Sequence, residues 1–533
     1  MKQKPAESSG IIQFAFRNAR LLAMLAGSFI ISIWTMVRFF SKSSNFDLVG
    51  QQVLAHQWLT GLHGGAIIGP TNYILKIFVL YMPLDMIHVS QRGKLVFMTL
   101  LVNVVTYILM ILLLEKVWRL FYSRIPKSFY TAMLWLALAA GSVFWIQFTN
   151  SRNIEVVGGL LLVYLMLRLL KAAPTIKLSM LLVLVASILF FADPLQVYMT
   201  AIPALAYVFV LFFADRSNQK FSRVLLILGA LTVGFVMSKC IALGIESIFK
   251  TNFLVVANQR TGSLFATLID SAIPLSKQTA RLYVAGYELG RFVEALNLLF
   301  VLGIGVLGVW YVWKRIIPRK LGLLVGLFWI TDALVYMASG QALQSGTSRY
   351  LIMTVPFFVL FAAAVVSAKT KHKPVILLAT IILLCVNSGA LVYAFTQSWN
   401  PQFTKDAHSY AVITYMKDHS FTHGYASMDA ALPVNYLTSG SVRLLPVKCE
   451  AGNTIQPAFL FFDKTYYENI MSASADSEVP LILDGDQIAN SPNVCTKEDI
   501  RASLGNWQAQ DKLRDGSDVL LYDAGQIRQS IQH

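Results

Sequence analysis

The sequence predicts a polytopic α-helical membrane protein with a small α/β domain at its C-terminal end. Of its 533 residues, 56% are hydrophobic and only 14% are charged. A soluble chain usually carries about 25% charged residues. Apolar runs of about 17–25 residues are long enough to cross the hydrocarbon core of a bilayer. We count about eleven such runs, at 19–40, 95–115, 130–149, 154–170, 177–192, 195–213, 222–246, 292–313, 321–338, 350–368 and 374–396.

Basic residues predict the orientation of these spans. Lys and Arg gather before the first run and then in every second loop between runs, and the positive-inside rule assigns such segments to the cytoplasm. We therefore expect a cytoplasmic N-terminus and an external C-terminus. This topology accounts for the net charge of +16, so no nucleic-acid partner is expected. The internal basic loops carry Lys116, Arg119, Arg124 and Lys127; Arg168, Lys171 and Lys177; Arg216, Lys220 and Arg223; Lys314, Arg315, Arg319 and Lys320; and Lys369, Lys371 and Lys373.

Two further features of the sequence concern the first span and the compartment. The run at 19–40 is too long for the apolar part of a signal peptide and lacks a cleavage site, so we expect a retained anchor. No Asn-x-Ser/Thr glycosylation site occurs in the chain, which favours the inner membrane of a bacterium. Cys449 and Cys495 both fall in the external C-terminal segment, where oxidation is permitted, and we predict that they form a disulfide.

Three external segments are long enough to carry function. The segment 41–94 contains a stretch, 74–87, that is apolar but too short to span and predicts an interfacial or re-entrant helix. The segment 247–291 is basic and rich in aromatic and aliphatic residues. The tail, 397–533, is long enough for a small domain, and its strand-like runs and a helical pattern near 406–418 predict an α/β fold. We therefore expect a membrane domain at 1–396 and an external domain at 397–533.

Carboxylates at the external ends of the spans are the main candidates for chemistry, because charges at membrane depth are costly and are usually paired or functional. Asp47 is the first acid after the first span, although it could be a solvated loop residue. Glu155 could be a first-turn acid stabilised by the helix dipole or a partner of Arg152. Asp193 precedes Pro194, as a helix N-cap often does. Other acids on this side are Asp85, Glu246, Asp270, Glu288, Glu294 and Asp332.

Basic residues on the external side oppose the positive-inside trend and are candidates for phosphate binding. Guanidinium groups hold phosphate through charge-assisted hydrogen bonds. Arg349 opens a span, and Arg260, Lys277 and Arg281 lie in the segment 247–291. The alternative is that their long side chains reach the membrane interface without binding a ligand.

Several common activities lack their motifs. The chain has no P-loop, no Gly-rich dinucleotide fingerprint, no Cys-x-x-Cys and no His-Glu-x-x-His. ATP-driven transport and a zinc peptidase are therefore not expected. His56 and His63 in the first external segment are isolated and fit surface residues better than metal ligands.

An early span followed by an external loop with an acid near its start resembles the GT-C glycosyltransferases, including bacterial enzymes similar to dolichyl-phosphate-mannose-protein mannosyltransferases. Members of this superfamily are polytopic enzymes that use polyprenyl-phosphate-linked sugars. The resemblance covers most of the chain. It is carried by Asn72-Tyr73-Ile74-Leu75-Lys76, Ser151-Arg152-Asn153-Ile154-Glu155, Ala192-Asp193-Pro194-Leu195, Ser348-Arg349-Tyr350-Leu351 with Pro356, and, in the tail, His423-Gly424-Tyr425-Ala426, Tyr436-Leu437-Thr438-Ser439-Gly440 and Val442-Arg443.

The resemblance implies transfer of a sugar to a hydroxyl of a glycan, lipid or protein acceptor of the cell envelope. Asp47 would be the general base of a single inverting displacement, with Glu155 or Asp193 as the second acid of the site. Arg349 and basic groups of 247–291 would stabilise the phosphate leaving group. The candidate phosphate-binding residues are Arg349, Arg260, Lys277, Arg281 and Arg152.

Asp47 departs from the family pattern in one respect. Many GT-C enzymes carry adjacent acids in the first external loop, whereas Asp47 stands among Phe46, Leu48 and Val49. This favours a mechanism without a metal ion, although a divalent cofactor, Mg or Mn, is left open. Two other functions also stay open: a lipid or solute transporter with intramembrane acids, and a non-catalytic assembly protein on a GT-C-like scaffold. The large tail and the lack of a clear inverted repeat argue against the transporter.

Overall fold

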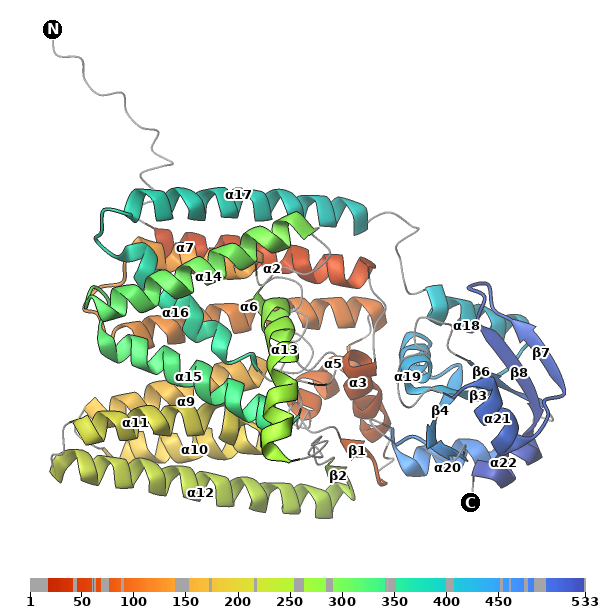
Figure 1. Ribbon diagram of the computed structural model, residues 1–533. Coiled ribbons are helices and arrows are strands. Elements are labelled where there is room, and N and C mark those ends of the chain that lie inside the picture. Colours follow the sequence, from red (N-terminus) through yellow and green to blue (C-terminus); the bar gives the residue numbers. More distant parts are fainter. Residues whose placement is uncertain are drawn as a thin grey trace, which may run out of the picture. The chain divides into compact units, whose positions relative to one another are not determined.

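The chain forms two compact units in a computed structural model (Figure 1). The first, the helical unit, comprises Met1–Arg38, Thr99–Lys239 and Ala257–Gln397, and the second unit comprises Phe39–Met98, Cys240–Val256 and Ser398–His533. The first external segment therefore belongs with the tail and not, as the sequence suggested, with the membrane helices. The structure describes residues 18–41, 46–59, 61, 64–68, 76–87, 91–139, 153–171, 175–214, 218–253, 263–283, 291–340, 343, 351–398, 407–450, 454–459, 462–473, 478–483 and 495–531.

Each of the eleven predicted spans contains a helix. Seven of the described helices are long and apolar enough to cross a membrane, namely α2, α6, α11 with η3, α12, α14, α15 and α17, whereas α10 and α16 are apolar but shorter. The protein is therefore a multi-pass membrane protein. The helices are α2 (Ala19–Ser41), α6 (Gln91–Trp118), α7 (Lys127–Ala139), α9 (Asn153–Lys171), α10 (Ile176–Ala192), η3 (Val197–Ala201), α11 (Ile202–Ala214), α12 (Asn218–Phe249), α14 (Arg291–Trp313), α15 (Arg319–Ala338), α16 (Thr354–Ser367) and α17 (Lys373–Ser398).

The surface of the helical unit is apolar, as a lipid environment requires. On α14, for example, the side chains of Val306 and Trp313 are 71% and 68% exposed. Soluble proteins rarely expose contiguous apolar surface on this scale. Inside the unit, polar groups are paired between helices: Asn297 and Asn387 exchange two amide hydrogen bonds of 2.9 and 3.0 Å. Such pairs link neighbouring helices at a depth where no water is present to form hydrogen bonds with the amides.

The basic segment 247–291, predicted as a loop, contains helix α13 (Leu264–Tyr283). One side of α13 is buried, and Ser271 Oγ on that side donates to the carbonyl of Met337 in α15. The other side exposes Phe265 and Ile273. Basic residues and Pro274 interrupt the apolar pattern of this segment, which is why the sequence did not show an amphipathic helix.

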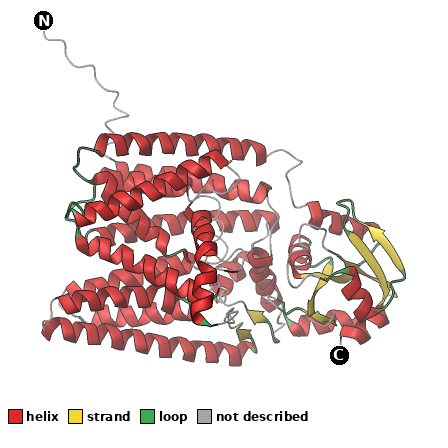
Figure 2. Ribbon diagram, viewed as in Figure 1, coloured by secondary structure: helices red, strands yellow, loops and turns green. Residues whose placement is uncertain are grey.

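The tail folds as the predicted α/β domain (Figure 2). Among its described residues, six strands form a sheet in the order β5-β4-β3-β6-β8-β7; β3 runs parallel to β4 and β6, and the other pairs are antiparallel. The strands are β3 (His423–Ser427), β4 (Arg443–Glu450), β5 (Thr454–Pro457), β6 (Glu478–Ile482), β7 (Ala509–Lys512) and β8 (Asp518–Asp523), and the helices are α18 (Ala407–Asp418), α19 (Met428–Leu437), α20 (Lys464–Ala473), α21 (Lys497–Leu504) and α22 (Ala524–Ile531).

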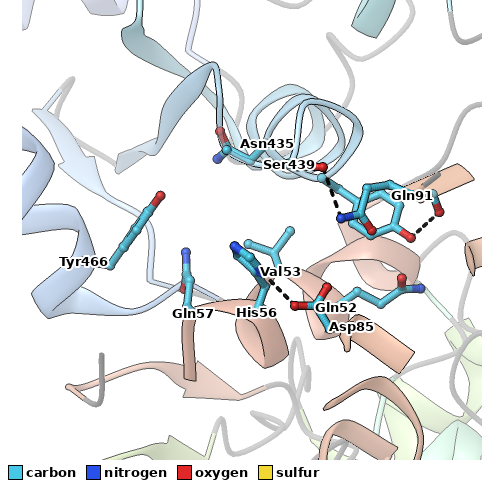
Figure 3. Close-up of a pocket in the computed structure, with 11 residues that line it drawn as sticks. Gln52, Val53, His56, Gln57, Asp85, Gln91, Asn435, Ser439 and Tyr466 are labelled. Atoms are coloured by element: carbon cyan, nitrogen blue, oxygen red, sulfur yellow. Dashed lines mark hydrogen bonds and ion pairs between the residues drawn. The ribbon is translucent and has the colours of Figure 1, made fainter. Parts of the chain in front are cut away.

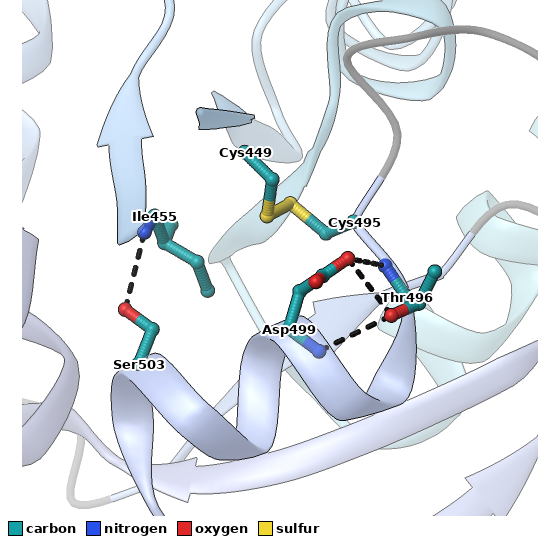
Figure 4. Close-up of a disulfide and its surroundings, with 6 residues drawn as sticks. All are labelled: Cys449, Ile455, Cys495, Thr496, Asp499 and Ser503. Carbon is teal, nitrogen blue, oxygen red and sulfur yellow. Dashed lines mark hydrogen bonds between the residues drawn. A yellow bond between two sulfur atoms is a disulfide. The ribbon is translucent and has the colours of Figure 1, made fainter. Parts of the chain in front are cut away.

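Cys449 and Cys495, the cysteines predicted to pair, form a disulfide between β4 and the start of α21 (Figure 4). The next residue, Thr496, caps α21 in a capping box with Asp499, which satisfies two backbone donors at the helix start. At the other end of α21, Ser503 Oγ accepts a hydrogen bond from Ile455 N of β5. The disulfide and this hydrogen bond together fix α21 to the edge of the sheet.

Candidate functional site

The three predicted catalytic acids lie in different units. Asp47 belongs to α3 (Phe46–Leu59) in the second unit, and its side chain lies outside the described residues. Glu155 and Asp193 belong to the helical unit. That the three acids share one site stays a prediction.

Glu155 and Asp193 lie at the same end of the α9–α10 hairpin. The two helices pack antiparallel, with Gly158 against Leu189, so the first turn of α9 lies beside the last turn of α10. Both acids are buried, and Asp193 is fully inaccessible to solvent. Asp193 is the C-cap of α10, and its Oδ1 accepts a hydrogen bond of 3.0 Å from Leu195 N. Its backbone oxygen also accepts from Gln196 N at 2.9 Å, so Asp193 caps the turn that leads into η3, as the Pro after it predicted.

Two further buried polar side chains, Gln196 and Thr200, lie near Asp193 at this end of the hairpin, which we call the buried acidic end. Thr200 Oγ1 donates to Gln196 Oε1 at 2.6 Å, and both side chains are fully buried. Thr200 also lies close to Gly159 of α9, where a Cβ would come within 3.1 Å of Thr200 Oγ1. The sequence reading missed Gln196 and Thr200, although their four-residue spacing places both on one helix face.

The predicted phosphate-binding residues are described only in part. Lys277 is exposed on α13, and Arg281, whose side chain lies outside the described residues, follows one turn later on the same face. Arg349, Arg260 and Arg152 lie outside the described residues. Their roles in phosphate binding stay predictions.

Asp332 is a buried acid in the middle of α15. It lies one turn after Phe328, which stacks on Phe357 of α16 at a centroid distance of 3.9 Å. Within the part of the chain that the structure describes, neither of its carboxylate oxygens has a hydrogen-bond partner. Its position in the middle of a span predicts a buried partner, and none is found among the described residues.

The first external segment forms an ionic cluster around Asp85. Its described helices are α3, η1 (Ile77–Tyr81) and α5 (Met82–Asp85), the last two within the stretch predicted as a short helix. Asp85 Oδ2 lies 2.7 Å from His56 Nδ1, while Lys94 Nζ donates to the Asp85 carbonyl at 3.1 Å and lies 3.7 Å from Oδ1. His56 is thus paired, which its isolated position in the sequence did not indicate.

The cluster shifts the protonation of both partners toward the charged forms. The hydrogen bond to Asp85 raises the pKa of His56 against an opposing effect of burial. Burial tends to raise the pKa of Asp85, but the hydrogen bond and charge of His56, together with Lys94, lower it overall. The protonated imidazole therefore pairs with the ionised carboxylate and holds α3 to α5 at mildly acidic pH.

The first external segment is also bound to the tail within the second unit. The buried carboxylate of Asp463 accepts hydrogen bonds from Gly64 N at 2.8 Å and from Tyr466 N at 3.0 Å, and Asp463 N donates to Gln57 Oε1 at 2.9 Å. Nearby, Tyr436 Oη donates to the Gln91 carbonyl at 2.5 Å. A small pocket lies between these segments (Figure 3).

The described residues contain no group of three or more His, Cys, Asp or Glu side chains placed to hold a metal ion. His56 and Asp85 approach each other, but Lys94, the third member of that cluster, is a cation and no metal ligand. These residues do not fit a divalent ion, and we derive no step through one.

No protein-family model matches the sequence, and no curated protein matches it. Among solved structures, ArnT from Cupriavidus metallidurans in the apo state is similar to 95% of this chain over 98% of its own length, with a TM-score of 0.52 and 10% identity. The same protein bound to undecaprenyl phosphate covers 94% of this chain, with a TM-score of 0.51 and 11% identity. At this identity the likeness shows a shared fold, and it extends over the helices and the tail together.

Proposed function

We propose that this chain, a membrane protein of the GT-C fold, is a glycosyltransferase that moves a sugar from a polyprenyl-phosphate carrier to a hydroxyl of a cell-envelope acceptor. The observation that carries the proposal is the likeness to ArnT over 95% of the chain, because one of the two ArnT structures contains undecaprenyl phosphate. The acceptor is a glycan, a lipid or a protein on the external side of a bacterial inner membrane.

The chemistry of such a donor assigns roles to the predicted residues. The donor carries its own leaving group, a lipid phosphate, whose developing charge needs cations. Arg349 and the basic residues Lys277 and Arg281 of α13 are proposed to supply them, with Arg260 and Arg152 as further candidates. The acceptor hydroxyl needs a base on the opposite side of the anomeric carbon. We assign this role to Asp47, in a single displacement that inverts the anomeric configuration.

Glu155 and Asp193 are proposed to complete the site from the helical unit. Glu155 lies in the first turn of α9, where the helix dipole favours a negative charge. Asp193 already accepts a hydrogen bond from Leu195 N. We therefore assign it a structural role, which is to fix the turn before η3, and not the role of a base. The proposal therefore predicts a larger loss of activity on removing Glu155 than on replacing Asp193 with Asn.

The test is consumption of a donor by purified protein in lipid nanodiscs. Undecaprenyl-phosphate sugars and an envelope glycolipid extract are supplied, and release of undecaprenyl phosphate is measured with and without EDTA. We expect Asp47→Asn to lower the rate by about 10²–10⁴-fold and Arg349→Ala to raise the apparent KM for the donor. Lys371→Ala, in a loop predicted to be cytoplasmic, is the matched control and should change neither quantity.

Three results would contradict parts of the proposal. Wild-type protein that is folded but consumes none of the donors would argue against glycosyl transfer. Full activity in Asp47→Asn would remove Asp47 from the mechanism but leave the reaction class in place. A loss of activity with EDTA that added Mg²⁺ or Mn²⁺ restores would replace the metal-free mechanism.

A further inference from the structure

A groove in the tail lies between α20, the end of β5 and α22. Its volume is about 610 Å³, well inside the range of small-molecule sites, about 300–1,000 Å³. The residues that line it all belong to the tail and therefore to one compact unit. The groove thus has room for a ligand of several chemical groups without any contribution from the membrane helices.

One side of α20 forms a wall of the groove. Lys464, Glu468 and Ser472 line the groove and are spaced four residues apart, so they lie in one row along the helix. Tyr467 and Met471 also line it, but their side chains are only 1% and 6% exposed. The groove is therefore polar at its rim and apolar at its base.

The segment that follows β5 forms another part of the lining. Pro457 and Phe459 are partly exposed there, and the ring of Phe459 meets the ring of Tyr467 edge-on, at a centroid distance of 5.5 Å. Between them, Ala458 N donates to the Pro446 carbonyl of β4 at 2.9 Å. These contacts fix the segment before any ligand enters, which lowers the entropic cost of binding.

The rim offers both donors and acceptors to a ligand. The exposed amide of Asn469 can do both, and Ser472 Oγ, which donates to the Asn469 carbonyl at 3.1 Å, can still accept. The guanidinium of Arg528, from α22, only donates. Lys464 Nζ lies 3.7 Å from Glu468 Oε1, so these two charges offset each other. The lining residues therefore carry little net charge.

The chemistry of these groups selects a neutral saccharide. A lipid chain would cover the polar rim without giving it hydrogen bonds, which is costly. A phosphate only accepts hydrogen bonds, so it would suit Arg528 but would face the acceptor oxygens of Glu468 and Ser472. Each hydroxyl of a saccharide both donates and accepts, and the apolar face of a sugar ring can pack on the partly exposed ring of Phe459.

We infer that this groove of the tail binds a short neutral saccharide, through Asn469, Ser472 and Arg528, with Phe459 as the apolar contact. The inference rests on the proposed function in one respect, because it takes the saccharide to be part of the acceptor. It adds that the tail recognises the acceptor at a site of its own. The three polar residues are binding groups, and the proposal gives none of them a chemical step.

The test is binding of maltose, cellobiose and chitobiose to the full-length protein in lipid nanodiscs, measured by saturation-transfer NMR without any donor. We expect at least one of them to bind wild-type protein, and its signal to fall about fivefold or more in Asn469→Leu and in Arg528→Gln, since each variant loses hydrogen bonds to the ligand. Asn469 is exposed, so Asn469→Leu stays informative if Arg528→Gln fails to fold. Asn506→Leu, at an exposed asparagine of the tail that does not line the groove, is the matched control and should bind as wild type does.

Three outcomes would overturn the inference: none of the three saccharides binds, Asn469→Leu binds as well as wild type, or inorganic phosphate at the same concentration displaces the saccharide. The result is separable from that of the proposed function. Saccharide binding that depends on Asn469 in a protein that consumes no donor would keep the binding site and reject the transferase. Donor consumption by a wild-type protein without saccharide binding would keep the transferase and reject the binding site.

Discussion

In the helical unit, hydrogen bonds between polar side chains lie within a helix or join neighbouring helices, whereas in the second unit several join segments that lie hundreds of residues apart. Asn297 of α14 and Asn387 of α17 pair their amides across two helices. Elsewhere on α14, the lack of a side chain at Gly308 lets Phe361 of α16 pack closely against the helix backbone. In the second unit, Asp463 binds Gly64 across 399 positions of sequence. The first unit should therefore respond to side-chain size, and the second to the loss of single polar or covalent links.

The largest expected effect follows from removing the disulfide of the second unit. The bond joins residues 46 positions apart, and the chain-entropy model gives a contribution of about 4 kcal/mol for such a loop. We expect Cys449→Ser with Cys495→Ser to lower the urea concentration at which the tail unfolds, as measured by pulse proteolysis. The control, Cys240→Ser with Cys385→Ser, removes the two free thiols of the chain and should leave the tail unchanged. Equal losses in both variants would mean that the disulfide does not stabilise the tail.

The next largest effect is expected at Asp463. Its carboxylate caps α20 and holds Gly64, so Asp463→Ala removes a helix cap and a charge-assisted hydrogen bond, together worth about 3 kcal/mol. The thermal midpoint of the purified protein should fall, and proteolysis between 59 and 76 should become faster. Glu468→Ala, which removes an exposed acid of the same helix, should change neither measurement. If protease sensitivity rises equally in both variants, Asp463 does not hold the first external segment.

The helical unit should instead be sensitive to one added methyl group. A Cβ at Gly308 would lie 2.2 Å from Phe361 Cε1, whereas a Cβ at Gly305, on the same helix, would meet no atom within 4 Å. We expect Gly308→Ala to cost about 2 kcal/mol through overpacking and Gly305→Ala to be neutral or stabilising by up to about 1 kcal/mol. Thermal midpoints in detergent compare the two variants. A stabilising Gly308→Ala would show that α14 and α16 can separate without loss.

The contrast between local contacts in the helical unit and long-range links in the second unit also explains which features the sequence could predict. Each membrane helix carries its own apolar signal, so all eleven predicted spans contain helices. The strand-like runs of the tail include Val479–Leu483 and Asp518–Tyr522, which overlap β6 and β8 for the same local reason. The place of the first external segment in the second unit was not predictable, because nothing near Gly64 or Gln57 marks Asp463 as their partner. The capping role of Asp193 was predictable from Pro194, because the signal is local: Asp193 accepts from Leu195 N and Gln196 N in the turn that leads into η3.

For the candidate site, sequence reasoning identified acids by their position relative to the spans but not by their neighbours. It found Glu155 and Asp193, which lie at one buried end of the α9–α10 hairpin. It missed Gln196 and Thr200, because an amide and a hydroxyl carry no motif. It also missed the pairing of His56 with Asp85, which depends on the packing of α3 beside α5.

The smallest expected effect is the pH dependence of the His56–Asp85 pair, and its sign follows from the two pKa shifts. The raised pKa of His56 gives a stabilisation that is complete below the unfolded value of about 6.5 and is lost as the pH rises through the folded value. The lowered pKa of Asp85 gives a stabilisation that is complete above about 3.8 and is lost as the pH falls through its folded value. The pair therefore contributes most between about pH 4 and pH 6.5.

This window can be measured by thermal unfolding at pH 5.5 and pH 8. Wild-type protein should lose more stability between these two values than His56→Gln, because the variant has no proton to release from this position. The matched control is His419→Gln, since His419 Nε2 and Asp511 Oδ2 are 3.9 Å apart on the surface of the tail and such exposed pairs contribute little. A wild-type and a His56→Gln profile that run parallel would show that the pair does not hold α3 to α5, and the second unit would then depend on Asp463 and the disulfide alone among the links tested.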